Sequence, residues 1–203
     1  MKAIAGAIVV AVLVALASGA SPLPQQATNT LTAIDTVPTR QQIDQAFINS
    51  PQTPLQNLSF LATDTDAGTD IGVRLRAIHA LAKYCTSTPC LPADEAHQTV
   101  RTVVAGNAHE LSGPRALILR AGIETLGAMR VGQDADFLVA QLSLLDHPSR
   151  DIRASTARAL AELCSGPSAV NALRLRYSHE LTEQVKLAIS EALRILGQCT
   201  TNP

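Results

Sequence analysis

One amphipathic segment occurs four times in this chain, and its repetition limits the folds that the chain can adopt. The clearest copy, DIRASTARALAELC, occupies residues 151–164, and its apolar start at Ile152 has counterparts at Val73, Ile118 and Val185. The intervals between successive starts are 45, 34 and 33 residues. A period in this range is typical of stacked helical repeats, in which neighbouring units cover one another's apolar faces. We therefore predict an all-α fold.

Apolar or small side chains recur at positions one, five, six, nine and twelve of each copy. In the clearest copy these positions hold Ile152, Thr156, Ala157, Leu160 and Leu163. The spacing places them along one side of a helix with 3.6 residues per turn. Because a single helix cannot bury such a stripe, we expect the four copies to pack against one another.

The copies resemble the second helix of a HEAT repeat of the short, bacterial, PBS-lyase-like kind, whose pattern is V-R-x-x-A-A-x-A-L-G-x-L. Three copies match its apolar-basic opening and two match its Leu-Gly ending: Val73-Arg74, Ile152-Arg153, Val185-Lys186, Leu126-Gly127 and Leu196-Gly197. The resemblance extends over about residues 54–198 and implies an α-solenoid of about four antiparallel helix hairpins. It says little about function, because functional sites are grafted onto folds.

The second copy departs from this pattern. Leu119 stands at its basic position, and Gly122 lies in the middle of its helix. We therefore expect the charge pairs between repeats, to which the resemblance assigns Arg74, Arg153 and Lys186, to be interrupted there. Gly122 is compatible with a bend of the stack and with close contact between helices, and the sequence leaves both open.

Turn-forming residues between the periodic segments set the boundaries of the repeats. We place one domain at 39–199, with repeats at about 54–84, 92–130, 134–164 and 167–198. The candidate first helices begin with Pro or Asp, both favourable starts, and span 54–62, 92–105, 134–145 and 167–177. A short helix after Thr39, an N-cap candidate, is expected to cover the N-terminal end of the stack.

The N-terminal segment has the features of an export signal. Met1 and Lys2 precede an apolar run that ends at residue 17, and small residues follow at 18–20. The run is short for a membrane span and no basic patch follows it, which favours a cleaved signal peptide at 1–20 over an uncleaved anchor. Residues 21–38, rich in Pro, Gln, Thr and Ser, are interpreted as a flexible linker. We predict export to the periplasm or beyond, without stable membrane insertion after cleavage.

The charge and the aromatic content argue against a nucleic-acid partner. The formal net charge is −1, Trp is absent and aromatic residues make up 2% of the chain. A near-neutral balance gives no electrostatic reason to expect nucleic acid, and the aromatic platforms on which bases stack are missing. The core must therefore be aliphatic, as suits an Ala- and Leu-rich helical stack.

Four cysteines in an exported chain favour disulfide bonds. Cys85 and Cys90 flank a short loop at the place where the first interval is stretched, and Cys164 and Cys199 end second helices one repeat apart. We predict the bonds Cys85–Cys90 and Cys164–Cys199. Metal binding by the thiols is the weaker alternative, because no CxxC or CxxH spacing accompanies them.

Alternating aspartates at Asp64, Asp66 and Asp70 form a weak calcium candidate. An EF-type loop requires Gly at its sixth position and Glu at its twelfth, where this chain has Thr69 and Leu75. A turn in which Asp70 caps the following helix is the favoured interpretation.

The sequence contains no recognisable catalytic constellation. The HExxH, GxSxG, GxGxxG and P-loop motifs are absent, and the histidines lack partners at metal-binding or nucleophile spacings, which predicts surface or capping positions for His79, His97, His109, His147 and His179. Carboxylate pairs such as Asp94-Glu95 and Asp134-Asp136 are explained by the dipole of a helix first turn. We therefore expect no cofactor and no catalysis.

The exposed side of the second helices is the candidate binding surface, because solenoids commonly bind partners on an extended concave face. Positions four, seven and eleven supply a strip of mixed charge that is equally compatible with a merely solvated face: Arg76, His79, Lys83, Glu124, Arg158, Glu162 and Glu191. The first hypothesis is a non-catalytic scaffold that binds a protein or peptide there. The alternative, an enzyme or enzyme accessory of the bilin-lyase-like kind acting on a bound chromophore or protein, requires an accessible nucleophile or an apolar pocket.

Overall fold

A computed structural model describes residues 25–32, 38–64 and 69–199. Within these ranges the regular structure is entirely helical, which confirms the all-α prediction. The α-helices are α1 (Gln25–Thr32), α2 (Arg40–Ala46), α3 (Pro54–Thr63), α4 (Ile71–Leu81), α5 (Glu95–Asn107), α6 (Gly113–Met129), α7 (Asp134–Asp136), α8 (Arg150–Glu162), α9 (Pro167–His179) and α10 (Glu183–Cys199).

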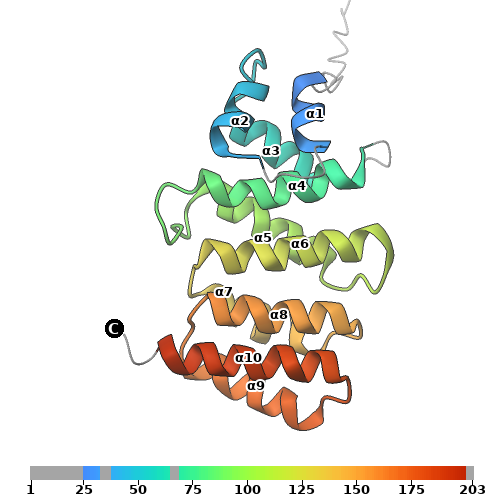
Figure 1. Cartoon of the computed structure of the whole chain (residues 1–203), viewed down its shortest axis with the longest axis vertical. Coiled ribbons are helices and arrows are strands. Elements are labelled where there is room, and N and C mark those ends of the chain that lie inside the picture. Colours follow the sequence, from blue (N-terminus) through green and yellow to red (C-terminus); the bar gives the residue numbers. More distant parts are fainter. Residues whose placement is uncertain (1–24, 33–37, 65–68, 200–203) are drawn as a thin grey trace, which may run out of the picture.

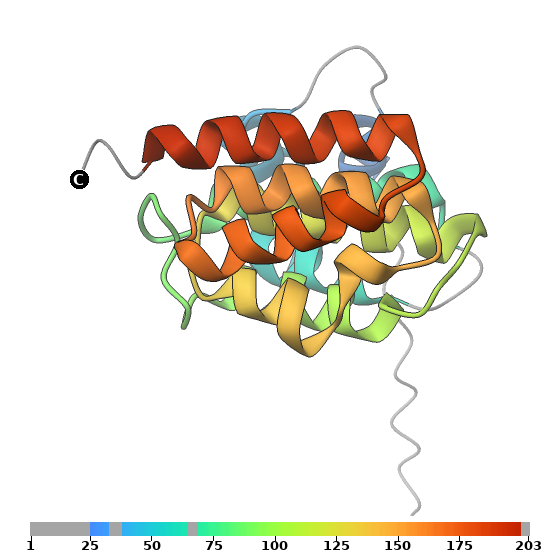
Figure 2. The same cartoon turned by 90° about the horizontal axis from the view of Figure 1, so that it is seen from below.

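The four copies of the repeated segment form α4, α6, α8 and α10. Figure 1 shows these helices one below another, and each contacts the next in the series. Behind them, α3 packs on α4, α5 on α6 and α9 on α10. Figure 2, seen along the stack, shows α10 above α9 in the view, so the two helices lie on different sides of the stack. The second helices therefore share one side of the chain's helical stack.

The predicted apolar stripe lies in the core. In α8, Ile152, Ala157 and Leu160 are buried, and Thr156 is buried with its hydroxyl donating to the Ile152 carbonyl oxygen at 2.8 Å. Corresponding residues of α4, α6 and α10 are also buried: Val73, Ala77, Ile78, Leu81, Ile118, Ile123, Leu126, Val185, Ile189 and Leu196. The repeated spacing thus identified the packing side of each second helix.

Gly122 provides a close contact between helices. A Cβ atom at this position would lie 2.6 Å from Cγ2 of Val104 in α5, a distance that real Cβ atoms do not tolerate. The helix α6 continues from Gly113 to Met129 without interruption. Of the two possibilities left open by the sequence, close approach of α5 and α6 is the one observed.

A buried ion pair joins α8 to the C-terminal end of α9. Nε and Nη2 of Arg153 donate to Glu180 at 2.8 and 2.9 Å, and Arg176 donates to the same carboxylate. These hydrogen bonds, led by that from Arg153, hold the pKa of Glu180 far below its usual value despite the opposing effect of burial. The arginine at position two of this copy therefore pairs with a residue at the end of the next helix along the chain.

The flexible linker predicted at 21–38 is wrong for residues 25–32. These residues form α1, which contacts α2 and α4 and buries Ala27 and Leu31 on one side. Only two apolar side chains, four residues apart, anchor this helix, so the polar composition concealed it. The remaining linker positions 21–24 and 33–37 and the signal peptide at 1–20 lie outside the described residues.

The cap helix predicted after Thr39 is α2, and Thr39 is its N-cap. The Thr39 side chain accepts a hydrogen bond from the Gln42 backbone N–H at 3.2 Å, and the Gln42 side chain accepts one from the Thr39 N–H at 2.7 Å. This reciprocal pair is a capping box. Ile43, Ala46 and Phe47 then bury the apolar side of the helix.

The regular helix predicted at 134–145 is also wrong. The three residues of α7 lead into a π-helical segment at Phe137–Gln141, and Ser143 adopts a left-handed conformation with φ of 52° before a 3-10 turn at Leu144–Asp146. Phe137, Leu138, Leu144 and Leu145 are all buried. In a regular helix these four side chains would share one face about 120° wide, so their spacing does not predict the observed unwinding.

Candidate binding surface

A row of polar side chains crosses α4, α6 and α8 on the second-helix side. His79 of α4 lies with Nε2 4.0 Å from Oε2 of Glu124 and with Nδ1 3.2 Å from Oγ1 of Thr125, both in α6. Glu124 also accepts hydrogen bonds from Arg120 Nε at 2.7 Å and from Ser155 Oγ of α8 at 3.2 Å. We call His79, Arg120, Glu124, Thr125 and Ser155 the polar row.

Burial changes the acid–base behaviour of this region. It lowers the pKa of His79, an effect that Glu124 opposes and Arg120 reinforces. It raises the pKa of Glu162 on α8, with Arg130 opposing and Glu124 reinforcing the shift. His79 is therefore neutral at neutral pH and is available as a hydrogen-bonding group.

The structure brings only part of the predicted strip together. His79 and Glu124 are in contact, whereas Arg158 and Glu162 are exposed on α8 and Glu191 is exposed on α10, where it pairs with Arg194 at 2.6 Å. Arg76 on α4 and Lys83 in the 3-10 turn that follows it, Ala82–Tyr84, are half-buried, and Nη1 of Arg76 is buried without a hydrogen-bond partner. The strip therefore contains separate local pairs, His79 with Glu124 and Glu191 with Arg194, and does not form a continuous charged surface.

An apolar groove adjoins the polar row at Arg120. Its volume is about 450 Å³, and it lies at the N-terminal ends of α4, α6 and α8. Leu111 and Leu117, 60% and 48% exposed, line it together with Ile71, Pro114, Ala116 and Ile152, and Asp151 adds a charge at the α8 end. Sequence reasoning missed this groove because Leu111 lies in a loop, outside every periodic segment.

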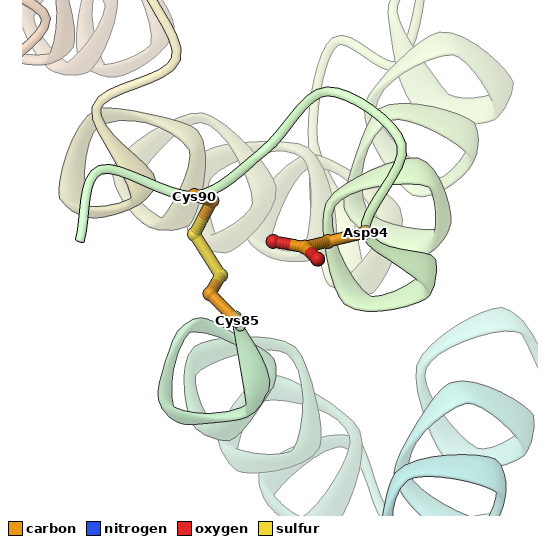
Figure 3. Close-up of side chains that lie close together, drawn as sticks. All are labelled: Cys85, Cys90 and Asp94. Atoms are coloured by element: carbon orange, nitrogen blue, oxygen red, sulfur yellow. A yellow bond between two sulfur atoms is a disulfide. The ribbon is translucent and has the colours of Figure 1, made fainter. Parts of the chain in front are cut away.

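The cysteines are paired as expected from the sequence. Cys85 bonds Cys90 within one loop, and Cys164 at the end of α8 bonds Cys199 at the end of α10. Figure 3 shows the Asp94 carboxylate directed toward the first bond. The two sulfur atoms and a carboxylate oxygen lie within 4.8 Å of one another, a spacing that would suit a metal ion. However, the sulfur atoms are bonded to each other and are not thiolates, the form in which cysteine binds metals.

Asp94 instead organises this loop. Its carboxylate accepts hydrogen bonds from Thr86 Oγ1 at 2.7 Å and from the backbone N–H groups of Leu91 at 2.8 Å and Thr86 at 3.3 Å. The Thr86 side chain is the main cause of a lowered pKa at Asp94, which burial opposes. The carboxylate thus fixes the loop between α4 and α5, in place of the helix-dipole role expected from the sequence.

The surface or capping position predicted for His97 is wrong, and His147 is buried and not at the surface. His97 is fully buried, with Nε2 2.8 Å from Oδ2 of the equally buried Asp134, and Arg101 Nη1 contacts Oδ1 of Asp134 at 2.8 Å. His147 is 5% exposed and its Nδ1 accepts from the Ser149 N–H at 3.0 Å. The burial of His97 could not be predicted from local spacing, because Asp134 lies 37 positions from His97 and 33 from Arg101 and reaches both only through tertiary packing.

Two of the three candidate calcium residues, Asp64 and Asp70, accept hydrogen bonds from nearby residues. Asp70 is the N-cap of α4 and accepts from the Val73 N–H at 3.1 Å, as the turn interpretation predicts. Asp64 accepts a hydrogen bond from the Thr69 hydroxyl. Asp66 lies outside the described residues.

Comparison with known proteins did not assign a family. No protein-family model, no curated protein and no solved structure matches the chain. Among the helices that the structure describes, none combines the length and the apolar character needed to cross a membrane.

Proposed function

We propose that this protein is an exported, HEAT-like helical scaffold that binds a protein or peptide on the side formed by its second helices. In this proposal the stacked hairpins form an α-solenoid that holds α4, α6 and α8 in fixed register. Two disulfide bonds are compatible with an exported protein, because such bonds persist in oxidising compartments. The single observation that carries the proposal is the continuity of the apolar groove with the polar row at Arg120.

A peptide can bind both the apolar groove and the polar row. Leu111 and Leu117 leave a contiguous apolar patch exposed to water, a feature that commonly marks an interaction site. Polar groups at the rim of such a patch fix the position of the partner and select it. An apolar side chain of the partner in the groove, with its backbone over His79, Glu124 and Arg158, is the arrangement that we propose.

The alternative of a bilin-lyase-like enzyme gains no support from the cysteines. All four are paired in the structure, so none offers a thiol to a chromophore. The groove alone does not favour a chromophore over a peptide.

Selection from a displayed peptide library followed by calorimetry tests the scaffold proposal. We expect Leu117→Asp to weaken binding of the selected peptides at least about tenfold, because burying a Leu side chain stabilises a complex by about 1.5–3 kcal/mol. Charge reversal at Arg158 should weaken binding further. Leu181→Asp is the matched control, since Leu181 is 94% exposed and does not line the groove.

Circular dichroism of each variant establishes that the helical content is unchanged. Failure to select any peptide, or equal affinity losses for Leu117→Asp and Leu181→Asp, would contradict the proposed surface.

A further inference from the structure

A second surface cavity, distinct from the groove, lies where the ends of α3, α4, α5 and α6 meet. Its volume is about 200 Å³, and five of the eight residues that line it are polar: Thr63, Arg74, Thr102, Asn107 and Arg115, with Ala62, Val103 and Gly106. Neither the polar row nor the predicted strip includes any of these residues. The cavity is therefore independent of the peptide surface proposed above.

Arg74 contributes a buried hydrogen-bond donor that has no acceptor. Its Nε atom is inaccessible to solvent and lacks a hydrogen-bond partner. Burial lowers the pKa of Arg74, the nearby Asp64 carboxylate opposes this effect, and the positive charge of Arg115 adds to it. Two guanidinium groups are thus close enough to repel each other at one cavity, an arrangement that an anion would relieve.

Arg115 is only partly neutralised by its neighbour. Its Nη1 donates to Oε1 of Glu110 at 2.9 Å, in a pair whose arginine side chain is 60% exposed. A guanidinium group has five N–H donors in a planar fork, so the remaining donors can bind a second acceptor. Exposure keeps this side chain free to reorient toward a ligand.

The neutral groups of the cavity complete the recognition chemistry. The hydroxyl hydrogens of Thr63 and Thr102 are directed to the carbonyl oxygens of Ser59 and Gln98, and the Asn107 amide donates to the Val103 carbonyl. Their oxygen atoms therefore keep lone pairs that can accept a hydrogen bond from a ligand. A ligand that carries an oxyanion and also an O–H or N–H group satisfies both kinds of partner.

We propose that this cavity binds a small oxyanion, a phosphate or a carboxylate group, through Arg74 and Arg115. Arg74 binds the anion through the Nη donors of its guanidinium group, which lines the cavity, and Arg115 closes over the anion from α6. The threonine and asparagine oxygens accept from the hydroxyl of a hydrogen phosphate, or from a hydroxyl or amino group next to a carboxylate.

Nuclear magnetic resonance of the full, disulfide-bonded protein tests this site directly. Inorganic phosphate and lactate are titrated separately at constant ionic strength, while the Nε–H signal of Arg74 is followed. A saturable shift of this signal with either anion supports the site, and the tighter anion distinguishes a phosphate from a hydroxycarboxylate ligand. No saturable shift with both anions would overturn the proposal.

Matched variants separate this site from general attraction between charges. Arg115→Gln should weaken the binding of the anion with the higher affinity at least about tenfold, because a charged hydrogen-bonding partner is lost. Arg194→Gln removes an equally exposed arginine on α10 and should leave the affinity unchanged. Arg115 is exposed, so its substitution is compatible with folding, whereas Arg74→Gln is interpreted only if circular dichroism shows native helicity. Equal losses in the two exposed variants would assign the binding to nonspecific charge.

Discussion

Individual buried residues of this protein have protonation states set by their partners, and His97 is the clearest case. Its Nδ1 lies 3.1 Å from the Pro92 carbonyl oxygen and its Nε2 2.8 Å from the Asp134 carboxylate, so both partners are acceptors. Only a doubly protonated imidazole donates to both. Burial opposes this charge, but the hydrogen bond and charge of Asp134 outweigh it, and the pKa of His97 is raised above 6.5.

The raised pKa predicts how stability depends on pH. A group whose pKa is higher in the folded state contributes its full stabilisation below the unfolded value, near 6.5, and loses it as the pH rises through the folded value. We expect the difference in unfolding free energy between the wild type and His97→Gln to be larger at about pH 6 than at about pH 9. Urea denaturation at both values measures it. His179→Gln, at an exposed histidine, is the control, and a difference that grows with pH would contradict the prediction.

At the scale of helices, the spacing between α6 and α8 depends on one glycine. A Cβ atom at Gly127 would lie 3.0 Å from the Cα and 3.2 Å from the Cβ of Ala159. Because backbone atoms cannot rotate away, we expect Gly127→Ala to destabilise the protein by about 1–3 kcal/mol. Gly197→Ala in α10 is the matched control, since a Cβ there meets nothing within 4 Å, and alanine should stabilise that helix by up to about 1 kcal/mol. Thermal unfolding of both variants decides the point, and equal effects would refute close packing as the cause.

The second helices could be predicted from the sequence because their apolar stripes repeat, and most stripe residues are buried in the structure, with Ser190 and Leu193 of α10 as exceptions. The failures have a different physical origin. Residues 25–32 form a helix that needs only Ala27 and Leu31 to anchor it, and residues 134–145 unwind although the spacing of their buried apolar side chains fits one face of a regular helix. Arg120 and Thr125 of the polar row were missed, since Arg120 takes part through Glu124 and Thr125 through a contact with His79 of another helix.

At the scale of the whole molecule, the two disulfides should differ in their contribution to stability. Cys164–Cys199 spans 35 positions and joins α8 to α10, whereas Cys85–Cys90 spans 5 positions within one loop. The entropy of loop closure predicts that the unfolding free energy falls by about 4 kcal/mol when Cys164 and Cys199 are replaced by serine. The same replacement of Cys85 and Cys90 should lower it by about 2 kcal/mol. Guanidinium denaturation of the two double-serine variants compares them. If Cys85–Cys90 contributed more stability than Cys164–Cys199, the prediction would be wrong, and the shorter bond would stabilise structure beyond its own loop.

The helices of this stack should unfold in a defined order, beginning at one end. Because α4 contacts α6, α6 contacts α8 and α8 contacts α10, each layer is protected mainly by the adjacent ones. The C-terminal layer is covalently fastened to its neighbour, while α1 and α2 at the opposite end are short and held by side-chain packing. Partial opening therefore starts at the N-terminal layer and leaves α8 and α10 as the last structure to be lost.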